Sequence, residues 1–229
     1  ESLNLALQHG FHEQAGRAYT NFSEAAIIFK EFELAERLLS EGLAFYARND
    51  LAWSHQLIGR QAQLRLEQGR FREAETIAKG VIGLERPTMV MKLPALTVLA
   101  MVKIRTGEAD GKSFLDQALR DATTIGEPQN IAPVLFGFVE AAWLAEDIAP
   151  ACQHLTTLAA MDLDNFDPWE LGALSAWWRR LAMPGPSPAP EERLPGPRAA
   201  EMRGNFAAAA AEWTGLGLPY EAALALMQA

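Results

Sequence analysis

The feature that most constrains the fold of this chain is a short pattern that recurs at nearly fixed intervals. Each copy has an apolar residue two positions after its first residue and, in four copies, an alanine five positions after it. The copies are 39, 38, 39 and 58 residues apart, and they start at Lys30, Gly69, Gly107, Glu146 and Gly204. Self-similarity at such a period is typical of stacked helical hairpins. The sequence therefore predicts an all-α fold, a right-handed solenoid of antiparallel helical hairpins with a period of about 38–39 residues.

The longer interval before the last copy contains a proline-rich segment. Residues 183–197 carry six of the 13 prolines, which should prevent regular helix or sheet and leave an exposed, partly disordered loop. The predicted organisation is a helical repeat array over 1–182, a Pro-rich loop over 183–197, and a terminal helical hairpin over 198–229 that continues the array. In that hairpin, Trp213 is expected to be buried where it docks on the helix of Trp177 and Leu181.

Apolar residues recur at spacings of three and four along nearly every segment, which predicts helices. The first helices of the pairs are expected near 12–29, 51–68, 93–106, 129–145 and 168–181. The second helices are expected near 32–48, 71–84, 111–125 and 149–160. The terminal pair is expected at 198–203 and 206–215, with a last helix from Tyr220. Left-handed residues are predicted to close helices at Gly10, Gly69, Gly107 and Gly126.

Prolines and a capping motif refine these boundaries. Pro94 and Pro133 lie inside apolar runs, so each is expected either to begin its helix in the first turn or to kink it. The sequence from Asp167 to Glu170 reads as a helix start, because Asp167 can cap, Pro168 suits the first helical position and Glu170 can reach back.

Composition and charge restrict the functional classes. A net charge of −9 argues against nucleic-acid binding by this segment, since contact with a duplex needs clustered Lys and Arg. The single cysteine, Cys152, excludes an internal disulfide and favours a cytoplasmic setting. The most apolar stretch, 93–104, is shorter than a membrane span. Both ends of the chain fall inside helical patterns, so we expect a piece of a longer protein.

Several patterns resemble chemical motifs without meeting their requirements. The segment 107–113 has three residues between its glycines where a phosphate-binding loop needs four, and a helix precedes it. Residues 162–173 fail a calcium loop at three positions, which favours a turn with a helix cap. Cys152 is expected to be a small core residue, and one of Trp177 and Trp178 is expected to pack in the core. We therefore predict no catalytic, cofactor-binding or metal-ligating residue and no cofactor.

One polar pattern repeats in register. On the first helix of the first pair, three polar residues lie at i, i+4 and i+7, and three more lie 39 positions later on the next first helix. First helices commonly line the concave surface of a hairpin solenoid, so this polar stripe is a candidate partner-binding surface, although an ordinary solvated face is the alternative. The stripe fades in the third repeat, near Pro94, Val98 and Met101. Its members are Arg17, Asn21, Glu24, Gln56, Arg60 and Gln63.

The order of the motifs resembles the TPR-like helical-repeat region of large LuxR-type, ATP-dependent transcriptional regulators. The resemblance rests on residues 93–99, 107–108, 115–119, 140–145 and 167–169. Its most specific part is the run from Gly204 to Trp213 followed by the motif 217–225. In that family an ATPase module precedes such an array and a helix-turn-helix domain follows it.

The resemblance implies a function for the chain. We expect a non-catalytic protein- or ligand-binding scaffold or sensor segment of a multidomain bacterial-type transcriptional regulator. It would receive a protein or small-molecule effector and bias self-association, while DNA would be bound by a flanking domain and no membrane would be involved. The alternative is a regulatory helical-repeat segment of a signalling enzyme such as a nucleotide cyclase.

Overall fold

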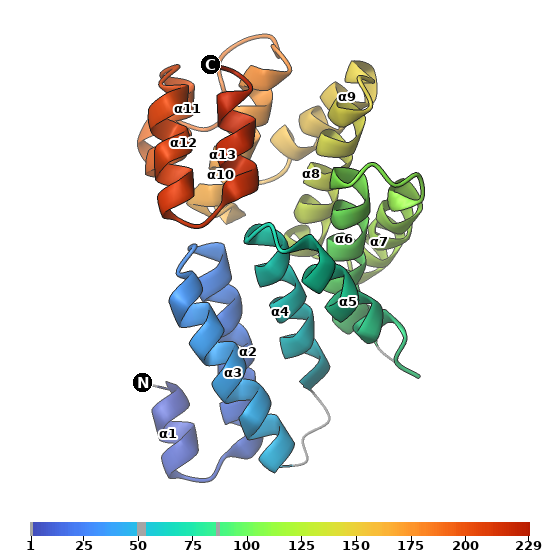
Figure 1. Ribbon diagram of the computed structural model, residues 1–229, viewed down its shortest axis with the longest axis vertical. Coiled ribbons are helices and arrows are strands. Elements are labelled where there is room, and N and C mark those ends of the chain that lie inside the picture. Colours follow the sequence, from blue (N-terminus) through green and yellow to red (C-terminus); the bar gives the residue numbers. More distant parts are fainter. Residues whose placement is uncertain (1, 50–53, 86–87) are drawn as a thin grey trace. The chain divides into compact units, whose positions relative to one another are not determined.

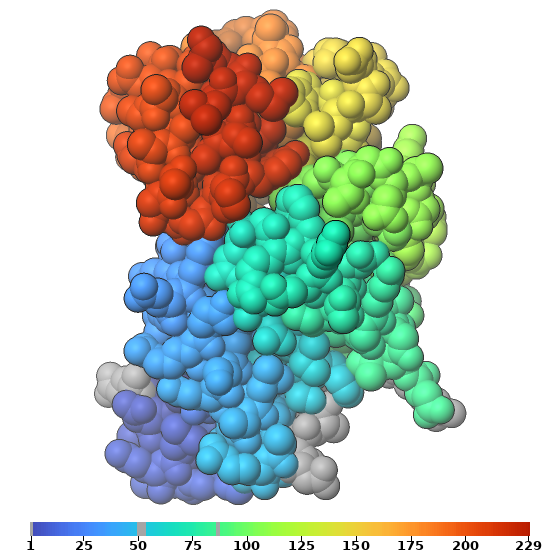
Figure 2. Space-filling view, viewed as in Figure 1, coloured from blue at the N-terminus to red at the C-terminus, as the bar shows by residue number. Residues whose placement is uncertain are grey.

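Every regular element that the structure describes is a helix, as the sequence predicts (Figure 1). The structure is a computed structural model that describes residues 2–49, 54–85 and 88–229. The chain divides into two compact units, unit 1 (Glu1–Val102) and unit 2 (Lys103–Ala229). Side chains fill the spaces between the helices of each unit (Figure 2).

Unit 1 contains two hairpins that pack on each other. Helix α2 packs against α3, α4 packs against α5, and α4 also contacts both α2 and α3. Tyr19, Phe45 and Leu57 belong to the apolar cluster between these helices. The helices are α1 (Ser2–Gln8), α2 (His12–Ile28), α3 (Phe32–Arg48), α4 (Ser54–Glu67), α5 (Phe71–Ile82) and α6 (Met89–Arg105), the last of which crosses into unit 2.

Unit 2 continues with paired helices around a second apolar cluster. Helix α8 packs against α7 and α9, and α12 packs against α11 and α13. Leu155, Leu171 and Leu174 are fully buried in the cluster that α8, α9 and α10 share. The helices are α7 (Gly111–Ile125), α8 (Pro128–Leu144), α9 (Ile148–Ala159), α10 (Pro168–Arg180), α11 (Gly196–Met202), α12 (Phe206–Gly215) and α13 (Pro219–Leu226), with 3₁₀ turns η1 (Leu163–Asn165) and η2 (Glu191–Arg193).

The repeated pattern corresponds to a repeated backbone conformation. All five residues that start a copy are left-handed, with φ between 58° at Glu146 and 79° at Gly204. In each turn, this residue donates its N–H to the carbonyl three positions back, and the next residue donates to the carbonyl five positions back. Both bonds satisfy carbonyls that a helix end leaves without partners. Lys30 and Glu146 adopt this conformation despite their Cβ atoms. The same turn also closes helices outside the repeat positions, at Gly10, Ala182 and Gly217.

The alanine of the pattern is the point at which each second helix becomes buried. Ala35, Ala74, Ala151 and Ala209 are fully buried. In the third copy the pattern puts Lys112 at this position, but Lys112 is exposed and Gly111 is buried instead. The helix cap explains the shift: the cap follows the left-handed residue directly in the other copies, whereas α7 is capped by Asp110, three positions after Gly107.

The helix boundaries agree with the sequence prediction to within a few residues, with one exception. Helix α6 begins at Met89 rather than near 93. Pro94 lies inside α6 and Pro133 inside α8, so neither begins its helix in the first turn. The other alternative, that each proline kinks its helix, stays a prediction. Each interior proline removes one main-chain hydrogen bond from its helix. The predicted start of the helix 51–68 lies outside the described residues, and α4 is described from Ser54.

The predicted start of α10 is confirmed in detail. One carboxylate oxygen of Asp167 accepts hydrogen bonds from the main-chain N–H groups of Trp169, at 2.7 Å, and Glu170, at 2.9 Å. The Glu170 carboxylate in turn accepts the N–H of Asp167 at 3.1 Å. This capping box satisfies donors that a helix start otherwise leaves without partners.

The Pro-rich segment is not the simple exposed loop that the sequence suggests. It contains η2 and leads into α11, which begins at Gly196. The Ser187 hydroxyl donates to the buried Ser175 hydroxyl at 2.8 Å, and Ala189 is buried in the cluster of unit 2. Prolines prevent a long helix in this segment, but they allow a turn whose small side chains pack against unit 2. Trp213 is buried as expected, and its ring centroid lies 5.6 Å from that of Trp169 on α10.

Candidate functional site

The polar stripe of unit 1 is divided by the structure into two parts. Its inner part joins α2 to α4, because Arg60 forms an ion pair with Glu24 and donates a 3.0 Å hydrogen bond to the Gln63 side chain. Burial lowers the pKa of Arg60, while the negative charge of Glu24 opposes that shift. The sequence thus identified three residues that do lie together, and their contacts link the two hairpins.

The outer part of the stripe has no such role. Arg17 and Asn21 are exposed on α2, and Gln56 is half-buried on α4. Within the described part of the chain, no side-chain hydrogen bond or ion pair engages these three residues. They are therefore available to contact a partner. The predicted fading of the stripe in α6 agrees with the burial of Val98 and Met101.

A second polar feature, which the sequence did not identify, is a set of buried and half-buried polar side chains in unit 2. One part centres on Glu140 of α8, whose carboxylate receives two hydrogen bonds from Arg105, at 2.7 and 2.9 Å. The Tyr220 hydroxyl donates a third, at 2.7 Å. Burial lowers the pKa of Arg105, but Glu140 more than compensates and leaves it above the ordinary value. We call the whole set the ionic cluster: Arg105, Glu140, Arg180, Arg198, Glu201, Tyr220 and Glu221.

The other part of the ionic cluster centres on Arg198 of α11. Its guanidinium bonds Glu201 at 3.0 Å and Glu221 of α13 at 2.7 Å. The indole N–H of Trp213 donates to Glu201 at 2.7 Å. Burial raises the pKa of Glu221, but Arg198, Arg105 and Arg180 together outweigh that effect and hold it below the usual range. These bonds connect α11, α12 and α13.

Arg180 of α10 is the least satisfied member of the ionic cluster. Its guanidinium carbon lies 4.6 Å from the centre of the Trp177 ring and 5.5 Å from that of Trp143. One of its nitrogens donates a long, 3.5 Å hydrogen bond to the Leu224 carbonyl, and its Nε is buried without a partner. Burial, and then the charge of Arg198, lower the pKa of Arg180.

The ionic cluster is suited to fixing the packing of unit 2. A protein with a buried ion pair is little more stable than one with apolar residues in the same place. Removal of only one partner, however, leaves an unpaired buried charge and lowers the stability strongly. Such pairs therefore favour one arrangement of helices over others. The signal in the sequence was a charged residue within an apolar run, as with Glu140 in α8, and a pattern of apolar spacing does not reveal its partners.

The remaining motif residues take ordinary structural positions. Lys112 is exposed on α7, and Asp162 accepts hydrogen bonds from Asp164 and Asn165 in the turn η1. Trp177 is buried, as predicted for one of the paired tryptophans. Cys152 is only half-buried, so it lies at the margin of the core rather than inside it. Among the described residues there is no group of three or more potential metal ligands and no helix with the length and apolarity of a membrane span.

Comparisons with known proteins supply no relative. No family model, no curated protein and no solved structure matches the chain. The functional interpretation therefore depends on the sequence pattern and on the contacts described above.

Proposed function

We propose that this chain is a non-catalytic binding scaffold, a TPR-like solenoid segment of a multidomain transcriptional regulator. In this proposal, the outer part of the polar stripe receives a protein or small-molecule effector. Effector binding would shift an equilibrium between assembly states of the whole protein, which requires different affinities for those states. DNA would be bound by a flanking domain.

The observation that carries this proposal is the repeated left-handed turn. Five turns at the repeat positions share one conformation and one pair of hydrogen bonds. Helices that neighbour one another in the chain pack as pairs, as in proteins that present an extended binding surface. The stripe supports the same interpretation, because it is repeated in register and its outer side chains are uncommitted.

The regulator assignment depends on the resemblance of the motifs, and it is tested on the full-length protein. We expect chromatin immunoprecipitation to find the protein at a limited set of promoters, and deletion of its gene to change the transcripts from them. An absence of promoter enrichment would remove the regulator assignment while leaving the scaffold intact.

The alternative is that the chain regulates a signalling enzyme such as a nucleotide cyclase. Cells in which the gene is deleted distinguish the two functions. If the protein is a cyclase, the deletion lowers the concentration of the cyclic nucleotide, and the protein itself is not found at promoters. A loss of cyclic nucleotide that a full-length copy restores would favour this second function.

A further inference from the structure

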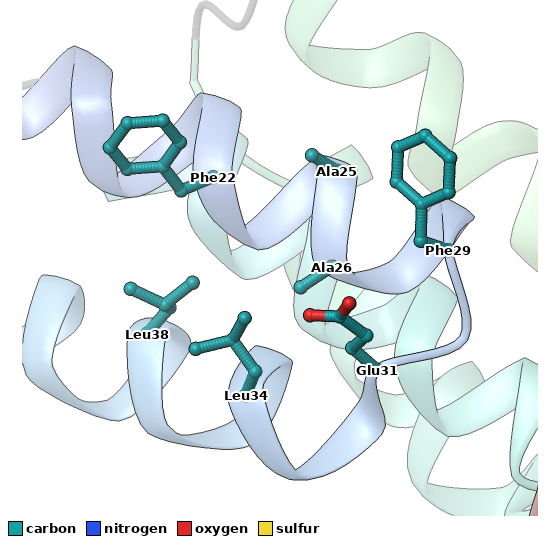
Figure 3. Close-up of a pocket in the computed structure, with 7 residues that line it drawn as sticks. All are labelled: Phe22, Ala25, Ala26, Phe29, Glu31, Leu34 and Leu38. Atoms are coloured by element: carbon teal, nitrogen blue, oxygen red, sulfur yellow. The ribbon is translucent and has the colours of Figure 1, made fainter.

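An apolar groove lies between α2 and α3 in unit 1, on residues that the polar stripe does not use. Its volume is about 270 Å³. Phe22 and Ala25 line it from α2 and Phe29 lines it from the C-cap of that helix, and Leu34 and Leu38 point from α3 toward α2 (Figure 3). The two phenylalanines are 39% and 53% exposed, which is unusual for rings that border an apolar floor. This α2–α3 groove therefore has apolar surface that another segment could cover.

Acidic side chains lie at both ends of the side of the groove that α3 forms. Glu31, Leu34, Leu38 and Glu41 are spaced at i, i+3, i+7 and i+10, which places them along one helix face. The Glu31 carboxylate points into the space between the two helices (Figure 3). Both glutamates are exposed, and neither takes part in a side-chain hydrogen bond or ion pair with the described residues. The two charges are about 15 Å apart along the helix, from ten residues at 1.5 Å each.

Comparison with the second repeat shows that the Glu31 side chain is not needed for the turn. Arg70 occupies the equivalent position in the second repeat, and its side chain bonds Glu73 at 2.6 and 2.7 Å. Glu31 caps α3 through its main chain alone, without a side-chain cap bond. Its carboxylate is therefore not needed to close the turn and is available to an external cation.

The apolar lining of the groove favours binding of a helix over binding of an extended peptide. An extended peptide would leave its main-chain N–H and C=O groups against apolar walls, where each unpaired group is costly. A helix satisfies those groups internally, and the small Ala25 and Ala26 allow its backbone to come close. Unit 1 already contains such a case, because α1 packs against α2, with Ala6 in the apolar cluster and Leu3 packed against it.

We propose that the α2–α3 groove binds an amphipathic helix of a partner protein, with apolar side chains on one face and a basic residue at each end of that face. The basic residues would meet Glu31 and Glu41, and the apolar ones would cover the rings of Phe22 and Phe29. A second copy of this chain fits less well, since a two-fold contact through the groove would bring the acidic ends together. The proposal adds a second binding surface to the proposed scaffold and does not depend on a role in transcription.

The test uses a synthetic probe and the intact chain. The probe is a fluorescent, side-chain-stapled helix of about 18 residues, long enough to be helical when stapled, with leucines at i, i+4 and i+7 and lysines flanking them. We expect saturable binding by fluorescence anisotropy at about 10–100 µM, in the range of weak interfaces. Amide NMR shifts should concentrate on residues 22–41.

Matched variants identify the groove. Glu31→Lys with Glu41→Lys should weaken binding about tenfold, and Phe22→Ala should weaken it similarly. Glu13→Lys with Glu33→Lys makes the same charge change at two exposed sites off the groove face, and it should leave binding within about twofold. A control probe with glutamates in place of the lysines should bind no better than background.

Three outcomes would overturn the proposal. The first is no saturable binding of the probe at about 1 mM, the limit of a useful weak interface. The second is an equal loss of binding in the variant that carries Glu13→Lys and Glu33→Lys, because the effect would then reflect overall charge. The third is a concentration-dependent dimer in light scattering that Phe29→Ala abolishes, which would assign the groove to a second copy of the chain. None of these outcomes affects the test by promoter occupancy.

Discussion

Truncation of Trp213 is expected to destabilise unit 2 severely, for two separable reasons. The ring is 1% exposed, and replacement of such a side chain by alanine costs about 3–5 kcal/mol through lost burial and the cavity left behind. Its indole N–H also donates to Glu201 at 2.7 Å. Loss of a donor to a buried charged group adds about 1–3 kcal/mol, although Glu201 keeps its bonds to Arg198. The expected total for Trp213→Ala is about 4–8 kcal/mol.

A second variant separates the two contributions. Trp213→Phe keeps an aromatic ring in the site but removes the N–H donor, so it should cost about 1.5–3 kcal/mol. Phe11→Ala is the control, because that ring is 56% exposed and its removal should change stability by less than about 0.5 kcal/mol.

Urea denaturation followed by far-ultraviolet circular dichroism gives the free energies, and hydrogen exchange of individual peptides assigns the change to a unit. Exchange should accelerate in residues 103–229 of both Trp213 variants. A cost below about 1 kcal/mol for Trp213→Ala, far under the cost of a core truncation, would refute the packing described for α10, α11 and α12.

Two further predictions concern the helix ends. Burial raises the pKa of Glu170 to about 7 from 4.5, so the folded state holds the proton of Glu170 more tightly than the unfolded state does. The protonated side chain therefore contributes to stability in full below the pKa of the unfolded state, 4.5. This contribution is lost as the pH rises through about 7. Wild type should therefore lose about 1–2 kcal/mol relative to Glu170→Gln between pH 5 and pH 8, after allowance for solvent screening, and parallel denaturation curves at the two pH values would contradict this. Glu146 has a φ of 58°, and Glu146→Gly should raise the free energy of unfolding by about 1 kcal/mol because glycine adopts this conformation without strain. Gly69→Glu should do the opposite, and a destabilised Glu146→Gly protein would show that the left-handed conformation of Glu146 is not strained.

The sequence was sufficient for the elements and their connections but not for the buried polar contacts. The turn glycines and the capping motif at Asp167 determine local backbone geometry, so they could be read from neighbouring residues. The ionic cluster could not, because Glu140 and Tyr220 are 80 residues apart and their pairing depends on how α13 packs. The shift from Lys112 to Gly111 has a similar cause, since one late helix cap changes which residue faces the core.

The proposed effector surface illustrates the same limit. Arg60 and Glu24 belong to one repeated pattern, yet only the structure distinguishes this linked pair from the free side chains of Arg17 and Gln56. The Pro-rich segment shows the reverse case. Its composition predicts exposure, whereas Ser187 and Ala189 are held by contacts to unit 2 that composition does not encode.

The most direct test of the proposed scaffold function is the regulatory response of the full-length protein when the outer stripe is altered. Arg17→Ala with Gln56→Ala should abolish the change in transcripts that the protein produces under inducing conditions, while its thermal unfolding and its level in the cell stay unchanged. Arg72→Ala with Gln153→Ala removes the same side-chain types from exposed positions outside the stripe and should leave the response intact. An unaltered response in the stripe variant, with the protein folded and present at its promoters, would contradict the proposal that this surface receives the effector.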